Sequence, residues 1–306
     1  MSKKILCICL SSTIQRTVNF GNLVLTEVNR SKSYRMDASG KAINSARVLS
    51  QLDKDCVSSF CPVGEKNKDL FLALAERDSL AIDYVTVPGF TRECWTLLDN
   101  CKGTTTELVV GEPQLDFDVD KCESEILSII KNKMKDFDGV LFAGSKPACF
   151  SDSIIPQIAE CAVNSGKVFL ADYHGKDLLN TLKKCTPSII KINETEFAQT
   201  FNLSVGPAGV VDSQMLKNAL IETTSRLNNI IVVTRGCNST YAAEKGLFTE
   251  CAVEKVNAVN TTACGDSFSA GFIYEYINTA DYASALKKGT WCASRNAELE
   301  TPGAIR

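Results

Sequence analysis

The 306-residue sequence contains a single histidine, His174, and no C-x-x-C pair among its fourteen cysteines. Metalloprotease sites need paired histidines and thiolate metal sites need closely spaced cysteines, so both kinds of site are excluded. The apolar run near the N-terminus, Ile5 to Leu10, is too short for a signal peptide or a membrane span. We therefore expect the cysteines to be free, buried and reduced, and the protein to be cytoplasmic.

Several common motifs are also absent. Neither G-x-x-x-x-G-K-[ST] nor G-x-G-x-x-G occurs, which argues against a P-loop and sets aside an α/β dehydrogenase. The protein-kinase motifs and the G-x-S-x-G of serine hydrolases are missing as well. The net charge of -3 carries no nucleic-acid or membrane-surface signature, so neither partner is expected. His174 is interpreted as a polar loop histidine.

Apolar runs alternate with stretches of helical periodicity along most of the chain. The hydrophobic content of 44% and charged content of 23% are those of an ordinary globular protein. Strands alternating with helices predict βαβ units, hence a mostly parallel sheet covered by helices on both faces. Strands are expected at 5–10, 56–62, 140–143, 168–171, 188–192, 230–234 and 249–259, and helices from about 41, at 69–78, from 121, at 152–164, at 213–227 and after 266.

A smaller β element interrupts this pattern. Residues 13–35 alternate loosely between polar and apolar, and residues 91–100 with 104–110 read as a hairpin turning near Lys102 and Gly103. We expect one domain over residues 1–306, with a discontinuous β lid from about 12–36 and 90–111.

Polar residues follow several of the predicted strands. Ser145, Asp172, Asn193 and Thr234 each come directly after an apolar run. Because the carboxyl ends of parallel strands meet at one edge of a sheet, these residues are expected to converge there with Asp266. Ligands of such sheets bind at that edge, so the convergence predicts a site.

The stretch Asn260 to Phe272, N-T-T-A-C-G-D-S-F-S-A-G-F, reads as a small-residue turn entering a helix. Free amides and the helix dipole at such a turn favour an anion, and small residues let a phosphate oxygen approach the main chain. Asp266 at this junction has two interpretations: a helix cap, or a base that accepts a proton beside a bound phosphoryl group. The local sequence does not separate them.

A second helix start lies at Ser39, which is expected to cap a helix whose apolar face is Ile43, Ala46, Leu49 and Leu52. Lys41 and Asn44 lie three residues apart in its first turn and are expected to face one ligand.

Taken together, these motifs resemble those of the PfkB (ribokinase-like) carbohydrate kinases. The turn at Asn260 is similar to the family's D/N-T-x-G-A-G-D signature, and S-G-K-A-I-N at Ser39 resembles its G-G-K-G-x-N. E-V-N-R at Glu27, G-S-K-P at Gly144, K-I-N-E-T-E at Lys191 and T-R-G at Thr234 are similar to further family segments in the same order. The T-R-E-C-W-T-L hairpin resembles the 1-phosphofructokinase and tagatose-6-phosphate kinase branch.

The resemblance implies a three-layer α/β/α fold with a small β-sheet lid, and it implies roles for individual residues. Asp266 would be the catalytic base, with an ordinary pKa of about 4 sufficing, and the main chain of Ala263, Cys264 and Gly265 the anion hole. The phosphorylated sugar would be held by Gln15, Ser39, Gly40, Lys41, Asn44, Arg92 and Ser145. ATP would be bordered by Lys191, Asn193, Thr234, Gly236, Ser239 and Gly265. Mg²⁺ would be organised through water by Asn193 and Glu196.

The sequence departs from the family pattern in four places. Gln15 stands where the family has an Asp that binds sugar hydroxyls, and Ala42 replaces a glycine of the sugar loop. Ala263 replaces the first glycine of the anion hole, and a methyl group is tolerated there if the backbone is right-handed. Ser239 stands where a second glycine often follows T-x-G.

Two readings follow from the resemblance. The first is an ATP- and Mg²⁺-dependent kinase of a sugar phosphate of the fructose-1-phosphate or tagatose-6-phosphate type, with Lys41 and Arg92 favouring a phosphorylated acceptor. The second, motivated by Gln15, Ala42 and Ala263, is a sensor of the same fold that binds sugar phosphate or nucleotide without turnover. In this branch lids pair across a dimer, so a homodimer through the lid is expected. The sequence does not choose the sugar.

Overall fold

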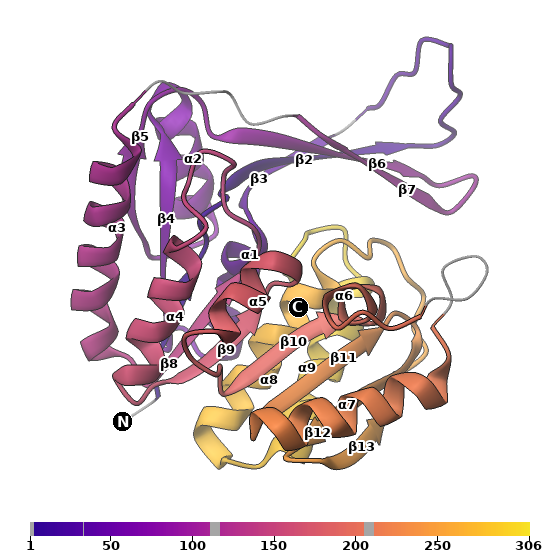
Figure 1. Ribbon diagram of the computed structural model, residues 1–306. Helices are drawn as coiled ribbons and strands as arrows, with labels where there is room; N and C mark the ends of the chain where they lie inside the picture. The colour runs from indigo at the N-terminus through magenta and orange to yellow at the C-terminus, as the bar shows by residue number, and fades with distance from the viewer. Residues whose placement is uncertain (1–2, 33, 111–116, 205–210) are drawn as a thin grey trace.

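The computed structural model of the protein describes residues 3–32, 34–110, 117–204 and 211–306. Helices cover both faces of a central nine-stranded sheet, and a four-stranded sheet projects from one edge of this body (Figure 1). The expected three-layer arrangement with a small separate sheet is confirmed. The expected lid segments include residues 33 and 111, which lie outside the described residues.

The central sheet has the order β13-β12-β11-β10-β9-β8-β1-β4-β5, and seven of its strands run parallel. β12 and β13 are antiparallel additions at one edge. The strands are β1 (Ile5–Ile8), β4 (Val57–Gly64), β5 (Ile82–Val87), β8 (Gly139–Ala143), β9 (Val168–Asp172), β10 (Ile189–Asn193), β11 (Ile230–Arg235), β12 (Asn238–Glu244) and β13 (Leu247–Cys251). The order reverses between β1 and β8, which makes the carboxyl ends of these strands the expected ligand edge.

Two groups of helices sandwich the sheet. One face carries α1 (Lys41–Leu52), α2 (Lys68–Arg77), α8 (Cys264–Thr279) and α9 (Tyr282–Ala297). The other carries α3 (Val119–Lys133), α4 (Ile154–Asn164), α5 (Gly175–Leu182), α6 (Glu194–Thr200) and α7 (Ser213–Leu227). Short 3-10 helices span Glu65–Asn67 and Met134–Asp136.

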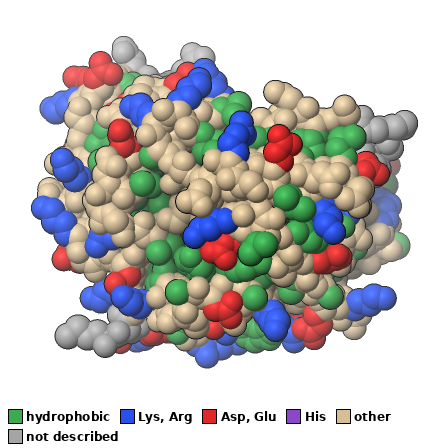
Figure 2. All heavy atoms as spheres, turned by 60° about the horizontal axis from the view of Figure 1, so that its bottom comes forward, with side chains coloured by type: hydrophobic (Ala, Val, Ile, Leu, Met, Phe, Trp, Pro, Cys, Tyr) green, Lys and Arg blue, Asp and Glu red, His purple; other side chains and the backbone are tan. Residues whose placement is uncertain are grey.

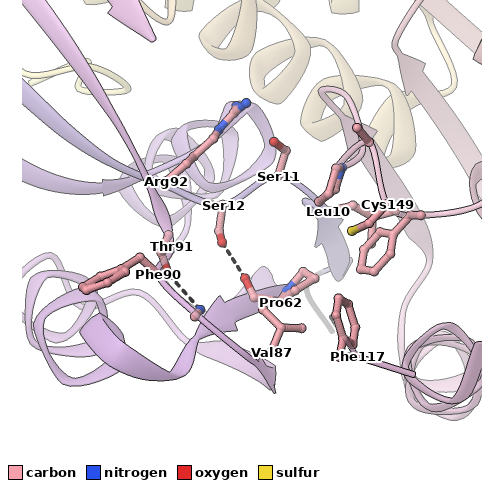
Figure 3. A pocket seen from close by; sticks show the side chains of 14 residues that line it. Leu10, Ser11, Ser12, Pro62, Val87, Phe90, Thr91, Arg92, Phe117 and Cys149 are labelled. Carbon is pink, nitrogen blue, oxygen red and sulfur yellow. Dashed lines mark hydrogen bonds between the residues drawn. The ribbon is translucent and has the colours of Figure 1, made fainter. Parts of the chain in front are cut away.

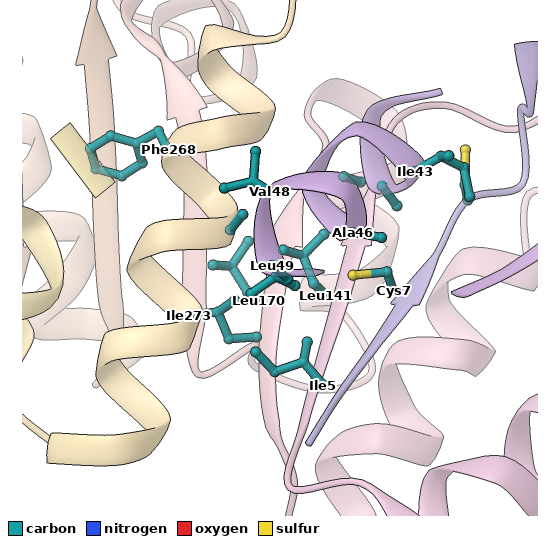
Figure 4. Close-up of a cluster of buried hydrophobic side chains, with 14 of the residues drawn as sticks. Ile5, Cys7, Ile43, Ala46, Val48, Leu49, Leu141, Leu170, Phe268 and Ile273 are labelled. Carbon is teal, nitrogen blue, oxygen red and sulfur yellow. The ribbon is translucent and has the colours of Figure 1, made fainter. Parts of the chain in front are cut away.

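The helices bury apolar stripes against continuous apolar strands, as a sheet covered on both faces requires. On the first face, Ile43 and Leu49 of α1 and Ile273 of α8 pack over Ile5 of β1 and Leu141 of β8 (Figure 4). Each of these five side chains is fully buried. This packing fixes the N-terminal turns of α1 and α8 above the ligand edge.

The small sheet has the order β3-β2-β6-β7, formed by β2 (Thr13–Phe20), β3 (Tyr34–Ser39), β6 (Arg92–Asp99) and β7 (Thr104–Val109). β2 pairs with β3 in antiparallel and with β6 in parallel register. Hydrogen bonds from Thr262 Oγ1 to Glu107 Oε1 (3.3 Å) and from Asn19 Nδ2 to Glu300 Oε1 (3.4 Å) join this sheet to the turns flanking α8 and α9.

Three expectations need correction. The predicted strand at 249–259 ends at Cys251, because its pairing with β12 ends there and residues 252–259 pair with no strand of the described chain. Ser39 does not cap α1: Gly40 is the N-cap residue, and the Ser39 hydroxyl donates to Asn44 Oδ1 instead. All fourteen cysteines are free, but only six are buried.

The face at the bottom of Figure 1 shows basic and acidic side chains interspersed, with apolar side chains between them (Figure 2). Among the described residues, no helix combines the length and apolar character that crossing a membrane would require.

Candidate active site

Asp266 lies in the first turn of α8 and is 6% exposed. Its Oδ2 accepts a hydrogen bond of 2.9 Å from Asn44 Nδ2, and its main-chain oxygen accepts one of 2.9 Å from Ser45 Oγ. Among the described residues, Oδ1 accepts no hydrogen bond. The carboxylate is therefore held on one side and open on the other.

Asn44 is oriented by its own neighbours. Its Oδ1 accepts hydrogen bonds from Ser39 Oγ (2.9 Å) and from Arg47 (3.1 Å). With Oδ1 engaged and Nδ2 donating to Asp266, the amide supports the carboxylate. Lys41 and Asn44 were expected to face one ligand. In the structure the Asn44 side chain turns toward Asp266 and the Lys41 side chain turns toward Asp172.

Burial raises the pKa of Asp266 to about 6, and the negative charge of Asp172 adds to this effect. Lys41, the hydrogen bond from Asn44 and Lys191 oppose it. The sequence argument required no more than an ordinary pKa of about 4, and the pKa of Asp266 lies above that value because the carboxylate is buried.

The turn before α8 exposes main-chain amides. The Ser267 amide bonds back to Ala263 O at 2.8 Å and the Cys264 amide to Thr261 O at 3.3 Å. The amides of Ala263 and Gly265 donate to no main-chain oxygen among the described residues. These donors, together with the helix dipole, make the turn suited to an anion.

Ala263 has left-handed backbone angles, φ 67° and ψ 9°, and is the N-cap residue of α8. The condition under which its methyl group was expected to be tolerated, a right-handed backbone, is therefore not met. The left-handed conformation costs an L-residue about 1–2 kcal/mol, which explains why glycine suits this position.

A cavity of about 550 Å³ opens beside this turn. We call it the α8 cavity, and its lining includes Thr234, Gly236 and Gly265, three of the residues expected to border ATP. Ser239 lies on the neighbouring strand β12 and is not among the lining residues. Sequence reasoning missed most of the wall: Thr240, Val253, Glu254, Lys255, Val256, Phe268, Thr290, Ala293 and Ser294.

Lys191, Asn193 and Glu196 lie at the end of β10 and the start of α6. Asn193 Oδ1 accepts from the Glu196 amide (2.9 Å) and Glu196 Oε2 accepts from the Asn193 amide (2.9 Å), which forms a capping box. Glu196 Oε1 lies 3.6 Å from His174 Nε2. Lys191 turns inward and pairs with Asp172.

The residues expected to hold the sugar lie on β2, β3, α1 and β6 and on the segments before α1 and after β8. Lys41 begins α1 with a partly exposed ammonium, Ser145 is exposed after β8, and Arg92 begins β6. Gly40 brings α1 close to the end of β1, since a Cβ there would lie 2.6 Å from Cys9 Sγ. Its φ of 122° likewise requires glycine.

Gln15 and Arg92 are held within the small sheet. Gln15 is buried, and its Nε2 donates to Thr96 Oγ1 at 2.7 Å. Arg92 Nε donates to Thr13 Oγ1 at 2.8 Å. The amide of Gln15 thus has a protein partner on β6, which the sequence gave no means to foresee.

A second cavity of about 420 Å³ lies beside Arg92 (Figure 3). Its wall is mainly apolar, and the hydroxyls of Ser12 and Thr91 are already bonded to Pro62 O and to the Gly64 amide. In Figure 3 the Arg92 side chain turns away from the aromatic rings of Phe90 and Phe117.

Asn296 of α9 supports the anion turn without any signal in the sequence. Its Nδ2 donates to Thr262 O (2.9 Å), and its Oδ1 accepts from Ser267 Oγ (3.0 Å) and the Gly303 amide (2.7 Å). One buried amide thereby ties the turn before α8 to the end of the chain.

The chain matches one family model and is similar to several solved structures. The model of the pfkB family of carbohydrate kinases matches residues 4–304. Among solved structures, phosphofructokinase-2 from Escherichia coli in complex with potassium superposes with a TM-score of 0.84 at 15% identity, covering 99% of this chain and 94% of that one. A possible 1-phosphofructokinase from Thermotoga maritima gives 0.84 at 18% identity, covering 98% and 93%. A putative phosphofructokinase from Staphylococcus aureus gives 0.74 at 22% identity, covering 97% and 92%.

Proposed function

The chain belongs to the pfkB family of carbohydrate kinases, and from this premise we propose that it transfers the γ-phosphoryl group of ATP to a hydroxyl of a sugar phosphate. The acceptor would be of the fructose-1-phosphate or tagatose-6-phosphate type.

The main support for this proposal is the environment of the Asp266 carboxylate. Its Oδ1 is open while Asn44 holds Oδ2, so one oxygen is available to an acceptor hydroxyl. Burial raises the pKa of Asp266 to about 6, close enough to neutrality for the carboxylate to take the hydroxyl proton as the new bond forms.

The amides of Ala263 and Gly265 lie beside Asp266 and would stabilise the transferring phosphoryl group. Phosphoryl transfer depends on positioning and charge stabilisation, and loss of one donor in such a hole typically costs about 3 kcal/mol. The α8 cavity reaches Gly265 and Cys264 and, at about 550 Å³, has the size of an ordinary small-molecule site, so we assign ATP to it.

The cations at this edge favour an acceptor that already carries phosphate. Lys41 lies close enough to Asp266 to influence its carboxylate, and Arg92 borders the second cavity. Both would contribute charge-assisted hydrogen bonds to a phosphate, with Ser145 as a further donor. Gln15 would reach the sugar only after giving up its bond to Thr96.

Mg²⁺ fits the donors at the start of α6. Among the described residues no cluster of three or more His, Cys, Asp or Glu side chains is arranged as a metal cage. The capping box leaves Glu196 Oε1 as an oxygen without a hydrogen-bond partner in the described chain, and Mg²⁺ is commonly bound through one carboxylate, waters and substrate phosphates. Glu196, with Asn193 beside it, would hold the hydrated ion, which supplies charge neutralisation to the phosphates.

Two further proposals concern the setting of the protein. The fourteen free thiols suit a reducing compartment, so we propose a cytoplasmic location. The small sheet exposes apolar side chains on and just after β7, at the start of β3 and in the β2–β3 connection. We propose that this sheet serves as a lid and pairs with the same sheet of a second copy. These side chains are Val24, Leu25, Val28, Tyr34, Leu108, Val109 and Val110.

A coupled assay of ADP release with fructose-1-phosphate, tagatose-6-phosphate, free hexoses and nucleosides tests the activity. We expect turnover with a sugar phosphate and none with nucleosides. If no compound is turned over while ATP and a sugar phosphate both raise the melting temperature, the sensor reading replaces the kinase. The left-handed Ala263 and the internally bonded Gln15 are the observations that favour that second reading.

A further inference from the structure

Asp172 ends β9 with a carboxylate that is 1% exposed and touches three other elements. Its Oδ2 accepts a hydrogen bond of 2.6 Å from Ser269 Oγ of α8 and another of 3.0 Å from Lys191 Nζ of β10. Its Oδ1 lies 3.9 Å from Lys41 Nζ of α1, which is too far for a hydrogen bond, and has no hydrogen-bond partner in the described chain. A buried carboxylate with one oxygen that accepts no hydrogen bond lowers the stability of the fold. A role other than stabilisation is therefore needed to explain Asp172.

The partner Lys191 lies against the anion turn. A Cβ added to Gly265 would come within 2.8 Å of Lys191 Nζ, so the ammonium touches the glycine whose amide faces the proposed phosphoryl site. Ser269 follows Gly265 by one helical turn, and its hydroxyl lies 3.1 Å from Gly265 O. Asp172 thereby fixes both a cation and the helix turn that carries the amides.

Several elements face Asp266 with charged or titratable groups. They are Lys41 of α1, Asp172 of β9, Lys191 of β10, Cys9 beyond β1 and Cys264 of α8. Among these groups only Asp172 is an ionised acid. Burial disfavours its ionisation, but Lys191, Lys41 and Ser269 outweigh this and hold the pKa of Asp172 below its usual range.

We propose that Asp172 is a positioning residue for phosphoryl transfer, holding Lys191 against Gly265 at the anion turn and drawing Lys41 to the side of Asp266. This inference rests on the proposed kinase activity. The negative charge of Asp172 has a second effect, since it favours the protonated form of Asp266. Asp172 thus links Lys41 and Lys191 to the proposed base, Asp266. No motif of the sequence indicates this role.

The test compares wild type, Asp172→Asn and Ser269→Ala, with ATP and fructose-1-phosphate, over a range of pH. In Asp172→Asn we expect kcat to fall about 10- to 100-fold, as for loss of a supporting partner, with a smaller change in the KM for ATP. The acid limb of the kcat profile should move to lower pH, because a negative neighbour of Asp266 has gone. Ser269→Ala keeps that charge, so its acid limb should stay in place.

A purely structural role predicts lower activity with an unmoved acid limb, and that result would overturn the proposal. If Asp172→Asn does not fold, Asp172→Asn/Lys191→Met removes both members of the buried ion pair. The acid limb should still move down, since Asp172 influences Asp266 more than Lys191 does. An unchanged or raised limb in the double variant contradicts the inference.

A readout independent of turnover is the free energy of unfolding of wild type relative to Asp266→Asn as a function of pH. Because the folded pKa of Asp266 is raised to about 6, its contribution is present below the unfolded value of about 3.9 and is lost as pH rises through about 6. In the Asp172→Asn background this loss should occur at lower pH. If wild type transfers no phosphoryl group, the proposed activity fails, whereas this titration still tests the influence of Asp172.

Discussion

At the scale of single residues, Asp266 combines two properties that a helix cap does not need. It is buried with a raised pKa, and its open oxygen points to no group of the protein in the described chain. A capping carboxylate would accept a main-chain N–H, as Asp118 and Asp212 do at the starts of α3 and α7. The structure gives Asp266 no such bond, which favours the base over the cap.

This reading predicts the behaviour of Asp266→Asn. The amide keeps the size of the side chain but cannot accept a proton, so kcat should fall about 10²- to 10⁴-fold while ATP affinity stays near that of wild type. Steady-state kinetics and calorimetric titration with ATP measure the two effects. A variant that retains more than a tenth of the wild-type kcat would contradict the role of base.

The wild-type pH profile gives a second residue-scale prediction. A base must be ionised to accept a proton, so kcat/KM, which reports the free enzyme, should rise with pH through about 6 and level off above it, following the pKa of Asp266. An acid limb of kcat/KM centred near pH 4 in steady-state assays would contradict this prediction.

Ala263 offers a test of backbone strain. Replacing it by glycine relieves the left-handed conformation, and although glycine costs more entropy on folding, we expect a net gain of about 0.5–1 kcal/mol in the free energy of unfolding. Urea denaturation with an unchanged m-value measures this. Ala280→Gly is the matched control, because Ala280 is also left-handed but ends α8, so it should gain as much stability without changing kcat.

At the scale of elements, α1 is tied to its surroundings by one buried guanidinium. Arg47 pairs with Asp78 at 3.0 Å and donates to Asn44 Oδ1, to Pro302 O at 3.0 Å and to Ala38 O. These bonds join α1 to the end of α2, to β3 and to the end of the chain. The helix that supports Asp266 is thus held from three directions.

Arg47→Met should therefore be severely destabilising. It leaves buried acceptors unpaired and removes a buried charge partner, so we expect a loss of about 3–5 kcal/mol in the free energy of unfolding. Arg77→Met is the control: Arg77 pairs with Asp78 and with the buried Asp37, but its own side chain is 41% exposed. Arg35 still pairs with Asp37 in this variant, so the loss of Arg77 should cost only about 1 kcal/mol. Equal losses in chemical denaturation would contradict the importance assigned to burial.

Helices and strands were predicted best from the sequence where burial determines the residue types on both faces of the segment. β1 and β8 are continuous apolar runs, β10 is apolar except for Lys191 and Asn193, and α7 is found at the predicted residues 213–227. The prediction failed at 252–259, where loose alternation suggested a strand but no strand among the described residues pairs with this segment. For the candidate site, polarity at strand ends predicted that Asp172 would lie at the same sheet edge as Asp266, which the small-residue turn had singled out. The contacts of Lys191 and Asn296 join distant parts of the fold, which spacing in the sequence does not encode.

At the scale of the whole molecule, the small sheet should control assembly. Its edge strand β7 exposes Leu108 and Val109, and an unpaired apolar edge invites pairing with another copy. Leu108→Lys combined with Leu25→Lys should convert a dimer to a monomer in light-scattering measurements. Leu247→Lys alters an equally exposed leucine on β13 and should leave the dimer intact; a monomeric wild type, or a dimeric double variant, would contradict the proposal.

The bond between Asn44 and Asp266 spans 222 positions of the chain, and Gly303 packs directly against the main chain of Asn44. The chain must therefore be synthesised through Asp266 before the carboxylate can meet its amide partner. Contacts of such long range form late and slowly in folding. A nascent chain from which α1 and the strands of the central sheet have emerged still lacks the Asp266 carboxylate, so under the proposed function it would become active only after α8 has been synthesised.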